Sequence, residues 1–199
     1  RRQAVTGGLT TVYDGKQIDW SGPWPQIHYF EIFQKQTGLD LNTVSEDELK
    51  EYARAEKIRI EENLGKGRLV DLIYKKKVRP SLIQPCFLIN PPVEIEPLAK
   101  KEPKNDREVQ RMQILAGGTE LGKGFSELND PLDQRQRFED QMKLRAAGDK
   151  EAQMLDEDYL EAMEYGMPPM AGFGLSERLF AVIMDKSVRE TVLFPPMKD

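Results

Sequence analysis

Acidic and aromatic residues are concentrated in one run of the chain, from Glu120 to Glu127. In a regular strand alternate residues share a face, so Lys123, Phe125 and Glu127 would point to one side, and Glu120 to the other with Gly122. Phe125 beside Glu127 suits a long cationic side chain, because the ring packs methylene groups and the carboxylate meets an ammonium. An edge strand carrying ordinary surface charges is the alternative that residue chemistry alone leaves open.

A metal site in this chain would rest on carboxylates. His28 and Cys86 are the only residues of their types, which leaves no thiolate cluster for zinc and no Cys-His pair with a supporting third group. Oxygen ligands suit Mg²⁺ rather than a transition metal. We expect His28 to be structural and Cys86, inside the apolar run LIQPCFLI, to be a small buried hydrophobe.

A near match to a phosphate loop lies in the same region. The run GGTELGKG places Gly117, Gly122 and Lys123 as in GxxxxGK[ST], but Gly124 stands where Ser or Thr would hold Mg²⁺. The residues that follow read as strand rather than helix, and Glu120 inside the loop would oppose a phosphate. We therefore expect no phosphate loop here.

Composition limits the function further. The chain has 199 residues, 39% of them hydrophobic and 32% charged, which is enough for one soluble domain with a substantial core. No apolar stretch approaches the roughly 18–20 residues that span a bilayer, and no signal peptide opens the chain. The net charge of −5 is not the balance of a nucleic-acid-binding domain.

Turn and cap signals divide the chain into elements. Asp14-Gly15 predicts a hairpin within residues 9–20, and Gly117-Gly118 predicts a tight turn between strands over 109–117 and 120–127. Ser45 and Glu48 predict a capping box that opens a helix over 43–57. The remaining predictions are helices over 26–36, 64–78, 130–147, 157–165 and 176–184, strands over 82–90 and 171–175, and a proline-rich loop over 91–103. This order predicts an α+β fold with an antiparallel β-sheet flanked by helices, and not a Rossmann fold.

Several motifs together resemble a known family. The run GGTELGKGFSELNDPLDQRQRFEDQ is similar to GGxEIxNGFSELNDxxDQxxRF of the lysyl type of class II aminoacyl-tRNA synthetase. The resemblance extends to SLIQPCFLINPPVEIEPLAK, to GMPPMAGFGLSERL and to VRETVLFPPMK. It implies that residues 1–199 are the C-terminal portion of a class II synthetase-like catalytic domain. The family's motif 1, motif 2 and N-terminal anticodon-binding barrel have no match, and the opening RRQAVTGG lacks an initiator Met. We therefore expect a fragment with an exposed sheet edge.

The resemblance assigns an ATP site. It implies that Glu120 holds Mg²⁺ bridging the ATP phosphates, with Gln113 where a second carboxylate often stands. Arg178 aligns with the motif 3 arginine, the catalytic residue that packs on adenine and reaches the γ-phosphate. Gly174 lets the backbone approach the nucleotide.

A lysine site is implied beside it. Glu127 aligns with the carboxylate that meets the ε-ammonium, and Phe125 and Gly172 with the rest of the side-chain pocket. Lys123 replaces an asparagine that helps to hold the substrate's α-amino or carboxylate end, and Glu96 replaces a serine.

The family reaction is ATP-dependent activation of lysine to lysyl-adenylate, followed by transfer to tRNA(Lys). Positioning and charge neutralisation carry such chemistry, without a covalent enzyme intermediate. The implied partners are ATP, L-lysine and, through the full-length protein, tRNA(Lys) and a second subunit, in the cytoplasm and with no membrane. Two alternatives stay open: a protein-lysylating paralogue of the elongation-factor-P type, and a non-catalytic synthetase-derived fragment or binding module.

Overall fold

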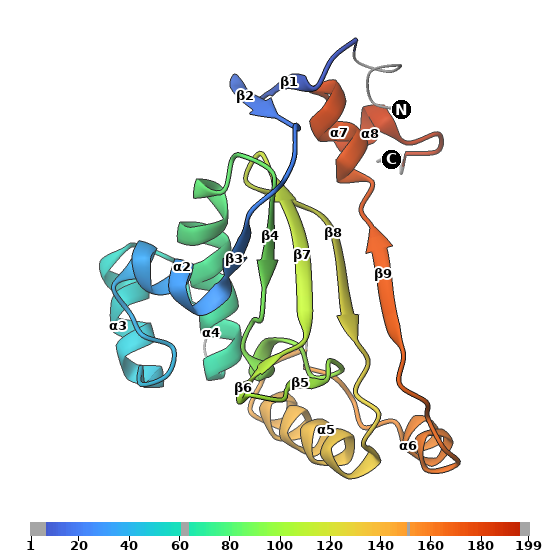
Figure 1. Cartoon of the computed structure of the whole chain (residues 1–199). Helices are drawn as coiled ribbons and strands as arrows, with labels where there is room; N and C mark the ends of the chain where they lie inside the picture. Colours follow the sequence, from blue (N-terminus) through green and yellow to red (C-terminus); the bar gives the residue numbers. More distant parts are fainter. Residues whose placement is uncertain (1–6, 61–63, 151, 196–199) are drawn as a thin grey trace.

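A five-stranded sheet forms the centre of the chain in a computed structural model that describes residues 7–60, 64–150 and 152–195. The strands, in their order across the sheet, are β3 (Gln26–His28), β4 (Cys86–Ile89), β7 (Arg111–Ala116), β8 (Thr119–Ser126) and β9 (Ala171–Leu175). Strand β3 pairs with β4 in parallel, and every other neighbouring pair is antiparallel. The predicted α+β fold is confirmed, with β3 as a parallel exception (Figure 1).

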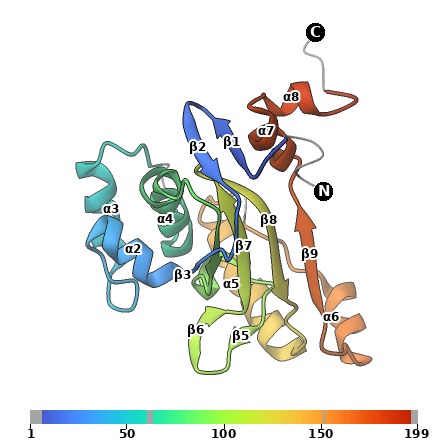
Figure 2. The same cartoon turned by 45° about the horizontal axis from the view of Figure 1, so that its top comes forward.

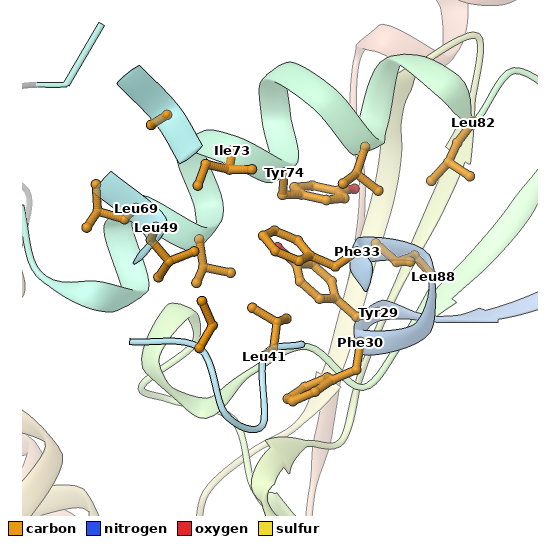
Figure 3. Packing of buried hydrophobic residues seen from close by; sticks show 14 of the residues in the cluster. Tyr29, Phe30, Phe33, Leu41, Leu49, Leu69, Ile73, Tyr74, Leu82 and Leu88 are labelled. Atoms are coloured by element: carbon orange, nitrogen blue, oxygen red, sulfur yellow. The ribbon is translucent and has the colours of Figure 1, made fainter. Parts of the chain in front are cut away.

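Three helices cover one end of this sheet, beside β3 and β4 (Figures 1 and 2). They are α2 (Tyr29–Thr37), α3 (Glu46–Ala55) and α4 (Lys66–Ile73), and α4 continues through a π-helical turn over Tyr74–Val78 into a 3-10 turn over Arg79–Ser81. Their apolar faces form the largest buried cluster, shown in Figure 3, together with Leu88 of β4. Burial of this face holds the helices against the sheet.

Two further helical regions lie at the two ends of the strands (Figure 1). Helix α7 (Arg178–Met184), followed by α8 (Val188–Thr191), packs on the hairpin of β1 (Thr10–Tyr13) and β2 (Lys16–Asp19). At the opposite end, α5 (Pro131–Ala146) packs on α6 (Glu157–Glu164) around Phe138, Leu160 and Met163. A small hairpin, β5 (Lys101–Glu102) and β6 (Asn105–Val109), lies near them.

The predicted turns and caps are confirmed. Asp14 and Gly15 have φ of 49° and 71°, and Gly117 and Gly118 have 61° and 72°, as tight hairpin turns require. The run 117–124 is therefore a hairpin and a strand, not a phosphate loop. The predicted capping box of Ser45 and Glu48 opens α3. The Asp130 side chain caps α5 in addition, because it accepts hydrogen bonds from backbone N–H groups of the first turn, and this cap was not predicted.

Some predicted boundaries are wrong. The predicted helix over 26–36 begins as strand β3, because its first three residues pair with β4. The predicted strand over 82–90 is limited to β4, since the carbonyls of Leu82 and Ile83 accept from the β7–β8 turn and Pro85 has no N–H to donate. Strands β5 and β6 and helix α8 were not predicted. The expectation about the opening RRQAVTGG concerns residues that lie largely outside those described.

Strand β9 forms one edge of the sheet, and all five of its residues are exposed. Phe173 and Leu175 project from it with 53% and 63% of their surface accessible. The expected exposed edge is therefore present. Over the same described ranges, no helix has the length and apolar character needed to cross a bilayer.

Ser45→Ala should lower the free energy of unfolding by about 1 kcal/mol. Ser45 and Glu48 form a reciprocal capping box on α3, a helix whose face buries Leu49 and Ala53. Chemical denaturation of both proteins measures the difference. Ser187→Ala is a matched control, because it removes the same motif from the four-residue α8, which has no buried residue, and should cost much less.

Candidate active site

A β-bulge brings the predicted site residues onto one face of the sheet. In the β7–β8 pairing, Ile114 faces Gly122 and Leu115 faces Glu120, so Leu121 is the extra residue. The expectation that Glu120 points away from Lys123 is wrong for this reason. The bulge reverses the alternation, and Glu120 shares a face with Gln113 and Lys123.

This face forms the floor of a cleft of about 740 Å³. The cleft runs between the helix α4 region, the loop around Glu96 and helix α5. Glu120, Gln113 and Lys123 line it, together with Arg111 from β7. The structure therefore gathers three of the predicted residues at one cavity, and adds an arginine that the sequence reasoning did not select.

A chain of charged groups connects these side chains. Arg111 Nη1 lies 2.7 Å from Glu96 Oε2, and Lys123 Nζ lies 3.5 Å from the same oxygen. Arg111 Nη2 is 4.0 Å from Glu120 Oε2, and the Gln113 amide donates a hydrogen bond to Glu120. Glu96, which is only 8% exposed, is thus compensated by two cations in a partly desolvated position.

Phe125 and Glu127 continue the face beyond Lys123. Lys123 Nζ lies 5.9 Å from the centre of the Phe125 ring. The Glu127 carboxylate makes no hydrogen bond or ion pair with any side chain of the described ranges. Burial, followed by repulsion from Glu96, raises the pKa of Glu127 above its ordinary value. An acceptor without a partner, next to an aromatic ring, is open to a cationic ligand.

Two glycines of the neighbouring strand β9 leave space beside these side chains. Gly172 pairs with Phe125 and Gly174 with Lys123, so their missing side chains would lie on the cleft face. A Cβ atom on Gly172 would approach Glu127 Oε1 to 3.1 Å, whereas one on Gly174 would meet open space. The glycines therefore keep the floor beside Phe125 and Glu127 free for a ligand.

Arg178 lies apart from the other predicted residues. It is the first residue of α7, three residues beyond the end of β9, and its side chain is exposed. Its backbone N–H donates to Ser176 Oγ at 3.3 Å. Arg178 does not line the cleft.

The two predicted metal ligands suit only a metal that is shared with the substrate. No group of three or more carboxylate, His or Cys side chains suited to a metal occurs within the described ranges. Glu120 is a single carboxylate, and the Gln113 amide nitrogen faces it. Mg²⁺ is commonly held by one or two carboxylates plus substrate phosphates, and the pair fits that mode and not an all-protein cage.

His28 and Cys86 have the structural surroundings that were expected. His28 Nε2 lies 3.1 Å from Glu108 Oε2, at the end of β3. Cys86 is buried, and burial raises the pKa of its thiol to about 11. Sequence reasoning missed Arg111 and also Tyr159, whose pKa is raised by burial and then by the charge of Glu127. Arg111 stands in no motif that would have identified it. Tyr159 lies in the run GDKEAQMLDEDYLEAMEYGMPP, which also resembles the family, but nothing in that run singled the tyrosine out.

Comparison with known proteins shows the family to which the chain belongs. The family model "tRNA synthetases class II (D, K and N)" matches residues 3–198. The lysine–tRNA ligase of Bacillus subtilis is 40% identical over 199 residues, covering 98% of this chain and 40% of the relative. The corresponding enzyme of Moorella thermoacetica is 41% identical, covering 99% and 41%. The chain thus spans about two fifths of the length of these curated relatives. The chain belongs to the class II tRNA synthetases of the D, K and N group.

Proposed function

We propose that this chain carries the lysine site and part of the ATP site of a lysine–tRNA ligase. The observation that carries the proposal is the unpartnered Glu127 carboxylate, which lies on the same face as Phe125 and next to Gly172 of the neighbouring strand β9. A carboxylate and an aromatic ring together select a long side chain that ends in a cation. The relatives' printed name supports lysine as that ligand.

The side chains along β8 define how lysine would be oriented in the site. Alternate residues rise about 6.6 Å along a strand, so Glu127 and Lys123 are about 13 Å apart along β8. With the ε-ammonium at Glu127 and the methylenes on Phe125, the α-carboxylate points toward Lys123. Glu120 lies further along, where ATP phosphates would meet the carboxylate end of lysine.

Within this arrangement the chain's residues act by positioning. Glu127 and Phe125 hold the substrate, and Lys123 offers a positive charge to its carboxylate or to a phosphate. Arg178 is proposed to contact adenine and the γ-phosphate. Glu120, with Gln113 beside it, would hold Mg²⁺ together with phosphate oxygens, and the metal would neutralise phosphate charge. No side chain forms a covalent bond to the substrate.

For the complete protein we propose ATP, L-lysine and tRNA(Lys) as substrates, a homodimeric assembly and a cytoplasmic location. We further propose that this chain is the C-terminal portion of its catalytic domain, with motifs 1 and 2 and the anticodon-binding barrel elsewhere. Lysine-dependent ATP–pyrophosphate exchange by the complete protein tests the activity. Exchange with lysine alone among the amino acids supports the proposal, and exchange driven by aspartate or asparagine contradicts it.

Lysine binding should depend on pH through Glu127. The carboxyl attracts an ammonium only when ionised, and its pKa is raised. Affinity should therefore rise with pH through that raised pKa and reach its plateau at a higher pH than an exposed glutamate would give. Calorimetric titrations from pH 4.5 to 8 measure this. The acid limb should be absent in Glu127→Gln, and a persisting limb would assign it to another group.

A further inference from the structure

A buried arginine of helix α5 has no role in the reaction described above. Arg137 is only 8% exposed, and α5 lies at the end of β8, directly beyond which Glu127 follows (Figure 1). A buried guanidinium is costly unless its donors are paired, so its partners indicate what it does. Arg137 Nε and Nη2 lie 3.0 Å and 2.8 Å from the two carboxylate oxygens of Asp133, one turn earlier in the helix. This bidentate pair fixes the plane of the guanidinium.

The third nitrogen of this guanidinium binds a loop. Arg137 Nη1 donates hydrogen bonds to the carbonyl oxygens of Ala99 at 2.7 Å and Pro97 at 3.3 Å. The side-chain amide of Gln134, which is 0% exposed, donates to the Pro97 carbonyl as well, at 3.3 Å. Two buried side chains of α5 therefore hold the backbone of loop 96–100, and the bonds from the charged guanidinium are of the stronger kind.

Loop 96–100 in turn holds the chain at Glu127. Ala99 and Glu127 form an antiparallel bridge. The backbone N–H groups of Leu128 and Lys100 donate to carbonyls across this bridge, at 2.9 Å and 2.8 Å. The loop therefore fixes the backbone of Glu127, while the carboxylate itself makes no hydrogen bond or ion pair with a described side chain.

The same loop carries an acidic group of the cleft. Its first residue is Glu96, whose carboxylate lies 2.7 Å from Arg111 and 3.5 Å from Lys123. The position of loop 96–100 therefore sets the place of two carboxylates, one through its own side chain and one through the backbone at the end of β8.

These contacts connect α5 to the end of the site where an ammonium group would bind. The guanidinium of Arg137 is committed to Asp133 and to the loop, so it is not itself a ligand for lysine. We propose that Arg137 is a positioning residue of the lysine site, which fixes the Glu127 carboxylate in place by holding loop 96–100. The inference rests on the proposed function, because it concerns how the pocket for the ε-ammonium is built.

The preference for lysine over norleucine, which lacks the ε-ammonium, tests this role. The ratio of the two dissociation constants depends on where the Glu127 carboxylate lies. Arg137→Met keeps much of the side-chain volume and leaves Asp133 with Lys101, whose Nζ lies 3.4 Å away. The variant should lower the preference by about 3-fold or more, because a displaced carboxylate makes a weaker charge-assisted hydrogen bond. Titration calorimetry of the chain with both amino acids measures the ratio.

Arg135→Met is the matched control. Arg135 lies two residues earlier in α5 and forms a bidentate pair with Glu157, but between exposed side chains. This variant should leave the preference unchanged. A loss of folded protein does not alter the ratio, because an unfolded fraction weakens both apparent affinities by the same factor.

Arg137→Lys is a milder second variant, since it keeps the charge but loses the planar fork that holds Asp133 and the loop together. Its preference should lie between those of the original chain and Arg137→Met. An unchanged preference in Arg137→Met, or in Arg137→Lys if the methionine variant does not fold, would overturn the positioning role and leave the proposed function intact. An equal fall in Arg135→Met would overturn it too, as a general effect of α5. Absence of any lysine preference in the original chain would overturn the proposed function and this inference with it.

Discussion

Glu127→Gln should weaken lysine binding by about 10- to 100-fold while ATP binding stays unchanged. The estimate is that of a lost charge-assisted hydrogen bond in a partly buried position, about 1.5–3 kcal/mol. Glu127 is free to bind because no described side chain pairs with it, and glutamine keeps its shape while removing its charge. Titration calorimetry with lysine and with ATP measures both affinities on one preparation.

Two comparisons make this result specific to the pocket. Glu161→Gln removes a charge from an exposed position of α6 and should leave both affinities unchanged. Phe125→Leu should weaken lysine binding less than Glu127→Gln does, because an apolar side chain remains to pack the methylenes. An equal loss of lysine and ATP binding in Glu127→Gln would indicate a folding defect and contradict the role of Glu127 in lysine binding.

Arg111→Ala should destabilise the chain by about 3 kcal/mol. The substitution leaves Glu96 buried with only Lys123, at 3.5 Å, for compensation, and breaking a buried ion pair from one side costs more than the pair itself contributes. Urea denaturation followed by circular dichroism measures the change in the free energy of unfolding.

The double variant Arg111→Met with Glu96→Gln separates charge from packing. It removes both members of the pair and keeps similar volumes, so it should recover most of the stability lost in Arg111→Ala. Arg135→Ala is the surface control, since it breaks a bidentate pair with Glu157 between two exposed side chains and should have a much smaller effect. A double variant as unstable as Arg111→Ala would contradict this account, because the loss of stability could not then come from the uncompensated charge of Glu96.

Local signals predicted the turns and caps well. Asp14-Gly15, Gly117-Gly118 and Ser45 act through backbone geometry within a few residues, so the sequence contains all the information that they need. Strand β3 was missed for the opposite reason. Its three residues are strand only because β4, about 60 residues later, pairs with them.

Which face of β8 each site residue occupies could not be predicted from the strand alone either. Regular alternation predicts that Glu120 and Lys123 lie on opposite faces, whereas a bulge at Leu121 places them on the same face. The bulge appears only in the pairing with β7, which no single-strand pattern contains. The role of Arg111 was equally hidden, because it follows from the approach of the loop around Glu96 to strand β7.

The most direct test of the account compares lysine with norleucine, which has the same length of apolar chain but no ε-ammonium. Calorimetric titration of the chain near pH 7.5 should show binding of lysine and binding of norleucine that is at least about 10-fold weaker, with the difference abolished in Glu127→Gln. Equal binding of the two amino acids, or a preference for lysine that survives in Glu127→Gln, would contradict the claim that Glu127 and Phe125 form a lysine pocket.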